Sequence, residues 1–154
     1  MKNGTHVATH PDPAWRDRAD FVIGASIGGD HHVKSEQLWA RRIVDLTFEI
    51  CCIPFHLYDL ALGDVVRTNE MYEFTGLVTP SGHFTFRVWF QDQEADPAEV
   101  VSAISQLGAS FEWSGTNLLA IDASDQGIAE GVANYLWSQE QAGRLIFETG
   151  KSDP

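Results

Sequence analysis

The sequence predicts an α+β protein: a strand-rich first part, then a ferredoxin-like βαβαβ segment with two helices on one face of its sheet. Two patterns lead to this prediction. Over residues 19–90, short apolar or alternating runs are separated by turns, as is typical of strands. Over residues 91–150, apolar residues recur at the spacing of amphipathic helices, with strands between them. We expect the first part to extend the second sheet or to curl into a half-barrel against it.

The strand-rich part follows a polar lead-in. Residues 1–12 are expected to be flexible, so that a single domain covers residues 13–150. The strands expected after this lead-in cover residues 19–27, 36–43, 47–53, 65–68, 71–78 and 83–90. Residues 55–62 have no clean period and are expected to form a compact turn packed on the core. The turn Thr79-Pro80-Ser81-Gly82 predicts a hairpin between the last two strands.

The helix-containing part, residues 91–150, has clear start and stop signals. Asp96 can cap a helix, Pro97 suits the first helical position, and Glu99 can reach back to the cap. Gly108 ends this helix. A second helix follows a strand over residues 117–122 and precedes a closing strand over residues 145–148. The cap of this second helix is either Ser124 or Asp125.

Size and composition predict a soluble globular protein of the cytoplasm. The chain has 154 residues, of which 44% are hydrophobic and 11% aromatic, enough for one core. No apolar stretch approaches the ~20 residues of a membrane span, and the first residues lack the apolar run of a signal peptide. Cys51 and Cys52 are adjacent and are expected to be reduced thiols in the core. A catalytic thiol activated by a histidine is the less favoured interpretation.

The net charge of −12 is unevenly distributed. Residues 1–90 contain 11 acidic and 8 basic residues, a net charge of −3, whereas residues 91–154 contain 11 acidic and 2 basic residues, a net charge of −9. Such a surface repels phosphate backbones and argues against nucleic-acid binding. It would attract a basic protein partner, although the simpler interpretation is solubility alone.

One stretch resembles a known family. The run from Glu49 to Val66, Glu-Ile-Cys-Cys-Ile-Pro-Phe-His-Leu-Tyr-Asp-Leu-Ala-Leu-Gly-Asp-Val-Val, is similar to the signature of the bacterial family called domain of unknown function 4265. That signature has Ile-Pro-Phe, an aromatic residue, an apolar turn and Gly-Asp-x-Val. Further similarities are the Ser81-Gly82-His83 turn that leads to Arg87, and the acidic C-terminal helices. The resemblance covers residues 10–150. It implies a bacterial cytoplasmic setting and supplies no activity.

The strand over residues 83–90 carries candidate binding residues. Side chains alternate along a strand, so its four apolar residues share one face, which belongs under the helices. The opposite face carries His83, Thr85, Arg87 and Trp89. In one interpretation this face pairs with neighbouring structure. In the other it is a recognition surface, where Arg87 binds a carboxylate or phosphate, Trp89 forms an apolar wall and His83 titrates at the rim.

The following candidates come from the turn between residues 56 and 64. It offers a histidine, a phenol and two carboxylates, namely His56, Tyr58, Asp59 and Asp64. A His–Asp pair can act as a general base or bind a metal, but no spacing here matches a metal-ligand motif. For Asp64, after Gly63, a turn-capping role is favoured.

Two classes of function stay open. The favoured one is a small non-catalytic binding or accessory protein that recognises a basic protein partner. The alternative is a small enzyme, or a binder of an anionic small molecule, with a pocket lined by His83 and Arg87 together with His56 or Tyr58. We expect no cofactor, because the signatures of phosphate, dinucleotide and nucleophile-elbow sites are missing from the sequence. The oligomeric state is left open.

Overall fold

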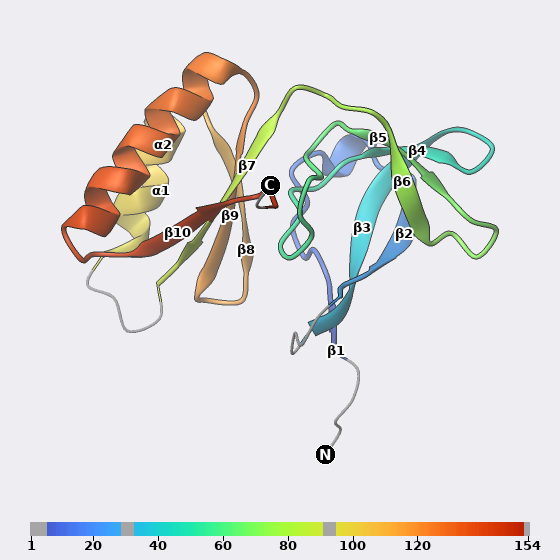
Figure 1. Cartoon of the computed structure of the whole chain (residues 1–154), viewed down its shortest axis with the longest axis horizontal. Coiled ribbons are helices and arrows are strands. Elements are labelled where there is room, and N and C mark those ends of the chain that lie inside the picture. The colour runs from blue at the N-terminus through green and yellow to red at the C-terminus, as the bar shows by residue number, and fades with distance from the viewer. Residues whose placement is uncertain (1–5, 29–32, 91–94, 153–154) are drawn as a thin grey trace.

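The computed structural model describes residues 6–28, 33–90 and 95–152, in which ten strands form two sheets and two α-helices cover one of them (Figure 1). The fold is thus α+β, as predicted. The two sheets are separate, and of the strand-rich part only residues 84–89 belong to the helix-covered sheet. The turn at residues 79–82 therefore does not close the predicted hairpin, because the strands before and after it lie in different sheets. Neither helix of the described ranges is long and apolar enough to cross a membrane.

The first sheet curves back on itself. It contains β1 (His6–Ala8), β2 (Phe21–Ser26), β3 (Val33–Val44), β4 (Thr47–Ile50), β5 (Val65–Thr68) and β6 (Phe74–Thr79). The strand order is β1-β3-β4-β5-β6, and β2 pairs with β3. The N–H of Gly24 in β2 donates to the carbonyl of Tyr72, and a bridge joins Gly24 to Glu73, beside the start of β6. This closure gives the curled form that we expected as one alternative, with Leu38, Phe48 and Val66 in its core.

The second sheet contains one strand that the sequence did not predict. Its elements are β7 (Phe84–Trp89), α1 (Pro97–Gln106), β8 (Ser110–Ser114), β9 (Leu118–Ala123), α2 (Gln126–Gln141) and β10 (Ile146–Thr149). All neighbours in the order β10-β7-β9-β8 are antiparallel. The expected order of strand, helix, strand, helix, strand lacks β8. This strand is short, and one of its faces carries the polar residues Ser110, Glu112 and Ser114. Such a polar segment is typical of a loop, and only the buried pairing of Glu112 with His10 explains why it forms a strand.

Both helices lie on one face of the second sheet, as predicted (Figure 1). Phe86 and Val88 of β7 and Ile121 of β9 are buried beneath Ile104 and Leu136 of the helices. The opposite face of this sheet points toward the first sheet. The helix layer therefore covers one side of β7, and the junction between the sheets lies on the other side.

The helix boundaries agree with the predicted signals. The Asp96 side chain accepts a hydrogen bond from the N–H of Ala98, and Pro97 is the first residue of α1. Gly108 has a φ of +98°, a conformation that glycine adopts at low cost after a helix. At α2, the cap is Asp125, whose carboxylate accepts from the N–H of Ile128 at 2.8 Å. This decides between the two caps that the sequence left open.

Part of the expected lead-in belongs to the fold. We expected residues 1–12 to be flexible, but His6–Ala8 pairs in parallel with β3, and His10 is only 2% exposed. The reason is tertiary: the imidazole of His10 bonds to carboxylates that are distant in the sequence. Residues 1–5 lie outside the described ranges. Similarly, β6 begins at Phe74 and not at residue 71, because the chain turns at Tyr72, which has a φ of +62°.

The capping contact of α2 gives a first prediction. Asp125→Ala removes the acceptor of the Ile128 N–H and should lower the free energy of unfolding by about 1 kcal/mol. Urea denaturation followed by circular dichroism measures this loss. Ser124→Ala is the matched control, because Ser124 is the exposed neighbour and is not the cap; it should change stability by less than about 0.5 kcal/mol. Equal losses in the two variants would contradict the assignment of the cap.

Candidate functional site

The two sheets meet along residues 51–64, which connect β4 to β5. Ile53, Phe55 and Leu62 of this segment are buried in one cluster with Leu118 and Ala120 of β9. Trp89, which is half-buried, packs against the same cluster, as does Trp15. The face of β7 that points away from the helices is therefore covered by this segment. Trp89 serves as part of the joint between the sheets, not as an open apolar wall.

Arg87 is buried completely within this junction, with an exposed fraction of 0%. Its guanidinium donates to the carbonyls of Pro54 and Leu57, and its Nε lies 3.4 Å from a carboxylate oxygen of Glu148. The ring of Tyr58 lies 5.0 Å from the centre of the guanidinium. The interpretation of this face as a recognition surface requires the Arg87 side chain to face open space or a cleft. The structure instead places it in the interior, where it holds residues 54–57 against β7.

A buried histidine bridges the two sheets. The Nε2 atom of His10 lies 2.7 Å from Glu36 of β3, and its Nδ1 atom lies 2.6 Å from Glu112 of β8. Both carboxylates also accept main-chain hydrogen bonds. Glu36 accepts from the N–H groups of Phe55 and His56, and Glu112 accepts from those of Ala14 and Ile53. The ring of His10 stacks on Phe55 with 4.1 Å between the centroids.

The bridge keeps its charges because its members stabilise one another. Burial opposes protonation of His10, but hydrogen bonds with Cys52 and with the two carboxylates raise its pKa to about 12. Burial likewise opposes ionisation of Glu36, but the hydrogen bond and charge of His10 and the two main-chain donors lower its pKa. A protonated imidazole between carboxylates is a structural ion cluster. Its side chains are buried from solvent.

The adjacent cysteines are both buried and free. Burial and the nearby Glu49 carboxylate raise the pKa of Cys51 to about 12. Burial also raises the pKa of Cys52, against the effect of His10. A thiol must ionise to act as a nucleophile. The environment of these two therefore opposes the catalytic interpretation and favours their role as small core residues.

The candidates His56 and Tyr58 are partly engaged in the same junction. His56 is half-buried, and its main-chain N–H donates to Glu36. Tyr58 is exposed, and its hydroxyl donates to Glu148 at 2.7 Å. Tyr58 and Glu148 thus lie over the guanidinium of Arg87. They also line a shallow hollow of about 400 Å³ together with Thr149, Lys151 and Ser152.

Asp64 caps a turn, as the favoured interpretation of the sequence holds. It is buried, one carboxylate oxygen accepts from the N–H of Ala61, and the other accepts from the N–H of Ser81. The preceding Gly63 has a φ of +86°, and a Cβ atom there would lie 3.1 Å from Ser81 and 3.2 Å from Trp15. This pair therefore joins residues 61–64 to the turn before β7.

Asp59 lies on the other side of the same segment and is exposed. Both of its carboxylate oxygens accept hydrogen bonds from Ser152, which lower the pKa of Asp59. The residue thus ties the C-terminal segment to the turn. Its neighbour in space, Lys151, adds a smaller effect in the same direction.

His83 directly precedes β7, near the rim of the junction. Its Nδ1 atom lies 2.8 Å from a carboxylate oxygen of Asp122. Burial raises the pKa of Asp122 to about 6, although the charge of His83 acts against this shift. The edge of the His83 ring also meets Trp15, with 5.8 Å between the centroids. A His–carboxylate pair of this kind is a candidate for proton transfer. Here, however, the Nδ1 atom of His83 and the carboxylate of Asp122 are hydrogen-bonded to each other.

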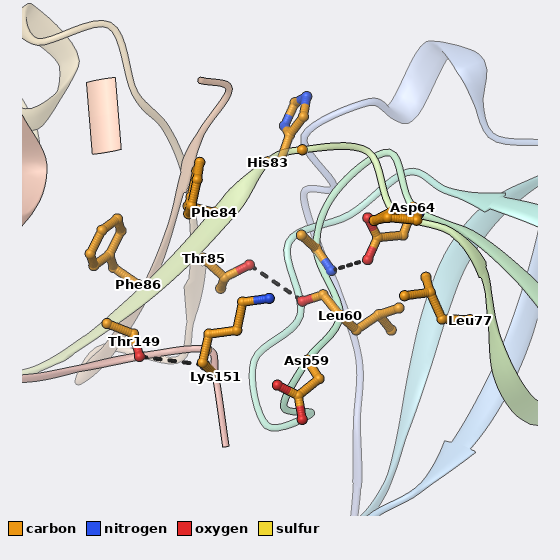
Figure 2. Close-up of a pocket in the computed structure, with 14 residues that line it drawn as sticks. Asp59, Leu60, Asp64, Leu77, His83, Phe84, Thr85, Phe86, Thr149 and Lys151 are labelled. Atoms are coloured by element: carbon orange, nitrogen blue, oxygen red, sulfur yellow. Dashed lines mark hydrogen bonds between the residues drawn. The ribbon is translucent and has the colours of Figure 1, made fainter. Parts of the chain in front are cut away.

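A pocket of about 380 Å³ lies beside this pair (Figure 2). It is formed by the turn 59–64, residues 77–86 and the C-terminal segment 149–151. His83, Asp59 and Asp64 line it, whereas Arg87, Trp89, His56 and Tyr58 do not. The structure thus brings three of the seven candidate residues to one cavity. Across the described parts of the chain, no group of three His, Cys, Asp or Glu residues is placed to hold a metal ion.

Sequence reasoning missed the residues with the densest polar contacts. His10 was assigned to a flexible lead-in, and Glu36 and Glu112 were counted only as surface charge. Lys151, which lines the pocket, was not singled out. A signal for Glu36 exists in the sequence, since it alternates with Leu38 and Ala40 on the inward face of its strand. No local signal marks His10.

The fold and these contacts define a two-sheet α+β protein that is joined by a buried histidine–carboxylate bridge. The chain belongs to the family described as Domain of unknown function (DUF4265), whose model matches residues 36–147. This confirms the resemblance found in the run from Glu49 to Val66.

A solved structure has a similar fold, described as the "Novel crystal structure of a hypothetical protein from Neisseria gonorrhoeae". The sequences are 22% identical, the TM-score is 0.71, and the match covers 86% of this chain and 96% of that chain. At this identity the likeness shows the fold alone. A comparison with curated proteins finds no match.

The His10 bridge predicts a pH dependence of stability. Folding raises the pKa of His10 from 6.5 to about 12, so above its ordinary pKa the folded state holds a proton that the unfolded state has lost. The free energy of unfolding should therefore fall as the pH rises, by up to about 1.4 kcal/mol per unit between about pH 7 and about pH 8, before the thiols of the unfolded chain begin to ionise. Urea denaturation at several pH values measures this slope.

His10→Gln tests the origin of that slope. The substitution leaves two buried carboxylates without their charged partner and should destabilise the fold by about 3 kcal/mol or more. It should also flatten the pH dependence. His6→Gln, at an exposed position of β1, is the control and should keep the wild-type slope. An unchanged slope in His10→Gln would show that the imidazole is not charged in the folded state.

The raised pKa values of Cys51 and Cys52 predict that these thiols react slowly with disulfide reagents. In the folded protein, Cys51 and Cys52 should react with a chromogenic disulfide reagent far more slowly than an exposed thiol at about pH 8. Both should react at once in about 6 M guanidinium chloride. The variant Ser102→Cys, on the exposed side of α1, supplies the reference rate. Labelling of Cys51 at that reference rate would revive the nucleophile interpretation.

Proposed function

We propose that this protein is a small, non-catalytic binding protein that recognises a basic protein partner through the outer face of its two helices. The observation that carries the proposal is the makeup of this face. Neither α1 nor α2 contains a lysine or an arginine, whereas Glu99 and Glu130 are exposed on them, and the exposed caps Asp96 and Asp125 add two carboxylates. The setting we propose is the bacterial cytoplasm, in keeping with two free thiols and a bacterial protein of similar fold.

The helix face stays negatively charged when the carboxylates that form ion pairs within the protein are left out of the count. Among the acidic residues after position 90, Glu112 and Asp122 are buried and paired with histidines. Arg144 lies close to Glu99 at the end of the helix layer, 3.2 Å from its carboxylate. The remaining exposed carboxylates of α2 and its cap have no basic side chain within ion-pair distance in the described ranges. A basic surface would neutralise them, and the attraction would speed its encounter. Asp92 and Glu94, which precede α1, lie outside the described residues.

An exposed aromatic side chain offers an anchor on the same face. Trp137 is 60% exposed, although tryptophan usually buries most of its surface. Glu130, Asn134, Trp137 and Gln141 are all exposed and follow the spacing of one helix face. Tryptophan is enriched among the residues that contribute most to protein–protein binding. Trp137 with Glu130 therefore suits a partner that presents an apolar hollow bordered by lysine or arginine.

The contacts of the other candidates favour binding over catalysis. The alternative of a small enzyme needs His83, Arg87 and His56 or Tyr58 at one cavity. In the structure His83 lines the pocket beside β7, Tyr58 lines the neighbouring hollow, and Arg87 lines neither. Arg87, Asp64 and both thiols are also committed to the interior. We therefore keep catalysis behind binding and do not assign a reaction.

Salt-dependent capture tests the proposal. The immobilised protein should retain a basic protein from a lysate of its own organism at about 50 mM salt and release most of it at about 300 mM, because salt screens exposed charges. The double variant Trp137→Ala/Glu130→Gln should reduce the capture about tenfold. Quantitative mass spectrometry of the eluted proteins measures both effects.

The control for this experiment is a matched pair on the other half of the chain. Met71 and Glu70 are exposed in the connection between β5 and β6, and Met71→Ala/Glu70→Gln also removes one large apolar side chain and one carboxylate. This control variant should capture as much partner as the wild type. The proposal fails if no captured protein distinguishes the helix variant from this control.

A further inference from the structure

The pocket beside His83 is mainly apolar, and its position is independent of the helix face. Leu60, Ala61 and Leu77 and the ring of Pro80 line one side of it, and the start of β7 lines the other. Figure 2 shows the rings of Phe84 and Phe86 pointing away from it, so that β7 contributes main chain and the side chain of Thr85. The hydroxyl of Thr85 donates to the carbonyl of Leu60 at 3.4 Å across the floor. Its volume of about 380 Å³ falls within the range of small-molecule sites.

The charged groups at this pocket are not equally available. Both oxygens of Asp64 accept main-chain hydrogen bonds, and both oxygens of Asp59 accept from Ser152. His83 is paired with Asp122, and Figure 2 shows its ring directed away from the middle of the pocket. Lys151 differs: its ammonium group points toward the Thr85–Leu60 hydrogen bond in the same view. Within the parts of the chain that the structure describes, the ammonium group makes no hydrogen bond or ion pair, and the nearby charge of Asp59 interacts with it only weakly.

We propose that this pocket binds a small molecule with an apolar body and one carboxylate, which pairs with the ammonium group of Lys151. The apolar lining would bury the body of the ligand, and the single available cation would fix its orientation. One negative charge suits the site better than two, because Asp59 and Asp64 are nearby and would repel a doubly charged phosphate. The proposal concerns a surface other than the helix face and does not depend on the basic partner.

Two probes with the same body and opposite charge test it. Octanoate should bind, and ¹H–¹⁵N NMR should show shifts concentrated in residues 59–64, 77, 82–86 and 149–151. Octylamine, which has the same chain length, should bind at least about tenfold more weakly, since it brings a cation to Lys151 and loses the charged hydrogen bond. Acetate lacks the apolar body and should produce no comparable shifts.

Variants then assign the charge recognition. Lys151→Gln should weaken the binding of octanoate about tenfold and leave that of octylamine unchanged or stronger. Lys34→Gln, at an exposed lysine of β3, is the matched control and should bind octanoate as the wild type does. The proposal is overturned if octanoate causes no shifts in these segments up to its solubility limit, if octylamine binds equally well, or if Lys151→Gln binds octanoate normally. None of these results bears on partner capture by Trp137, so the two proposals fail separately.

Discussion

The placement of His10 between Glu36 and Glu112 is the constraint on which the rest of the structure depends. Moving three ionisable groups out of water costs free energy, and the attraction within an isolated ion pair rarely recovers that cost. Here each carboxylate shares the imidazolium and also accepts two main-chain N–H groups, which supply the stabilisation that water would otherwise give. Because β3 and β8 belong to different sheets, the bridge can form only when both sheets are in place.

The bridge also determines where the chain can present chemistry. It orders residues 53–56, whose carbonyl at Pro54 then accepts from Arg87. The side chains on the polar face of β7 are thereby buried in the junction. Only the first residues of β7 reach the rim of the junction, where Thr85 lines the pocket. The helix layer lies on the opposite side of the same sheet (Figure 1). A ligand at the rim and a protein on the helices would therefore not compete for space.

Sequence patterns predicted the helices and strands that are stabilised by contacts between residues close together in the sequence. The caps at Asp96 and Asp125, the glycine after α1 and the alternation along β7 depend on residues within a few positions of each other. They predicted both helices, their sheet face and most strands. By contrast, His10 and Glu112 are 102 positions apart, and β8 is recognised as a strand only through its pairing with β9. Likewise, alternation placed Arg87 on the polar face correctly but could not show that residues 54–57 cover that face.

Gly63 and Asp64, which stand where the family signature has its Gly-Asp pair, have a consequence for how such signatures are used. Here the glycine allows Trp15 and Ser81 to approach the main chain, and the carboxylate of Asp64 links two turns. In this chain the motif thus fixes the position of the start of β5, in one sheet, relative to the start of β7, in the other. Family members found by this motif can share a joint and still differ in everything they bind.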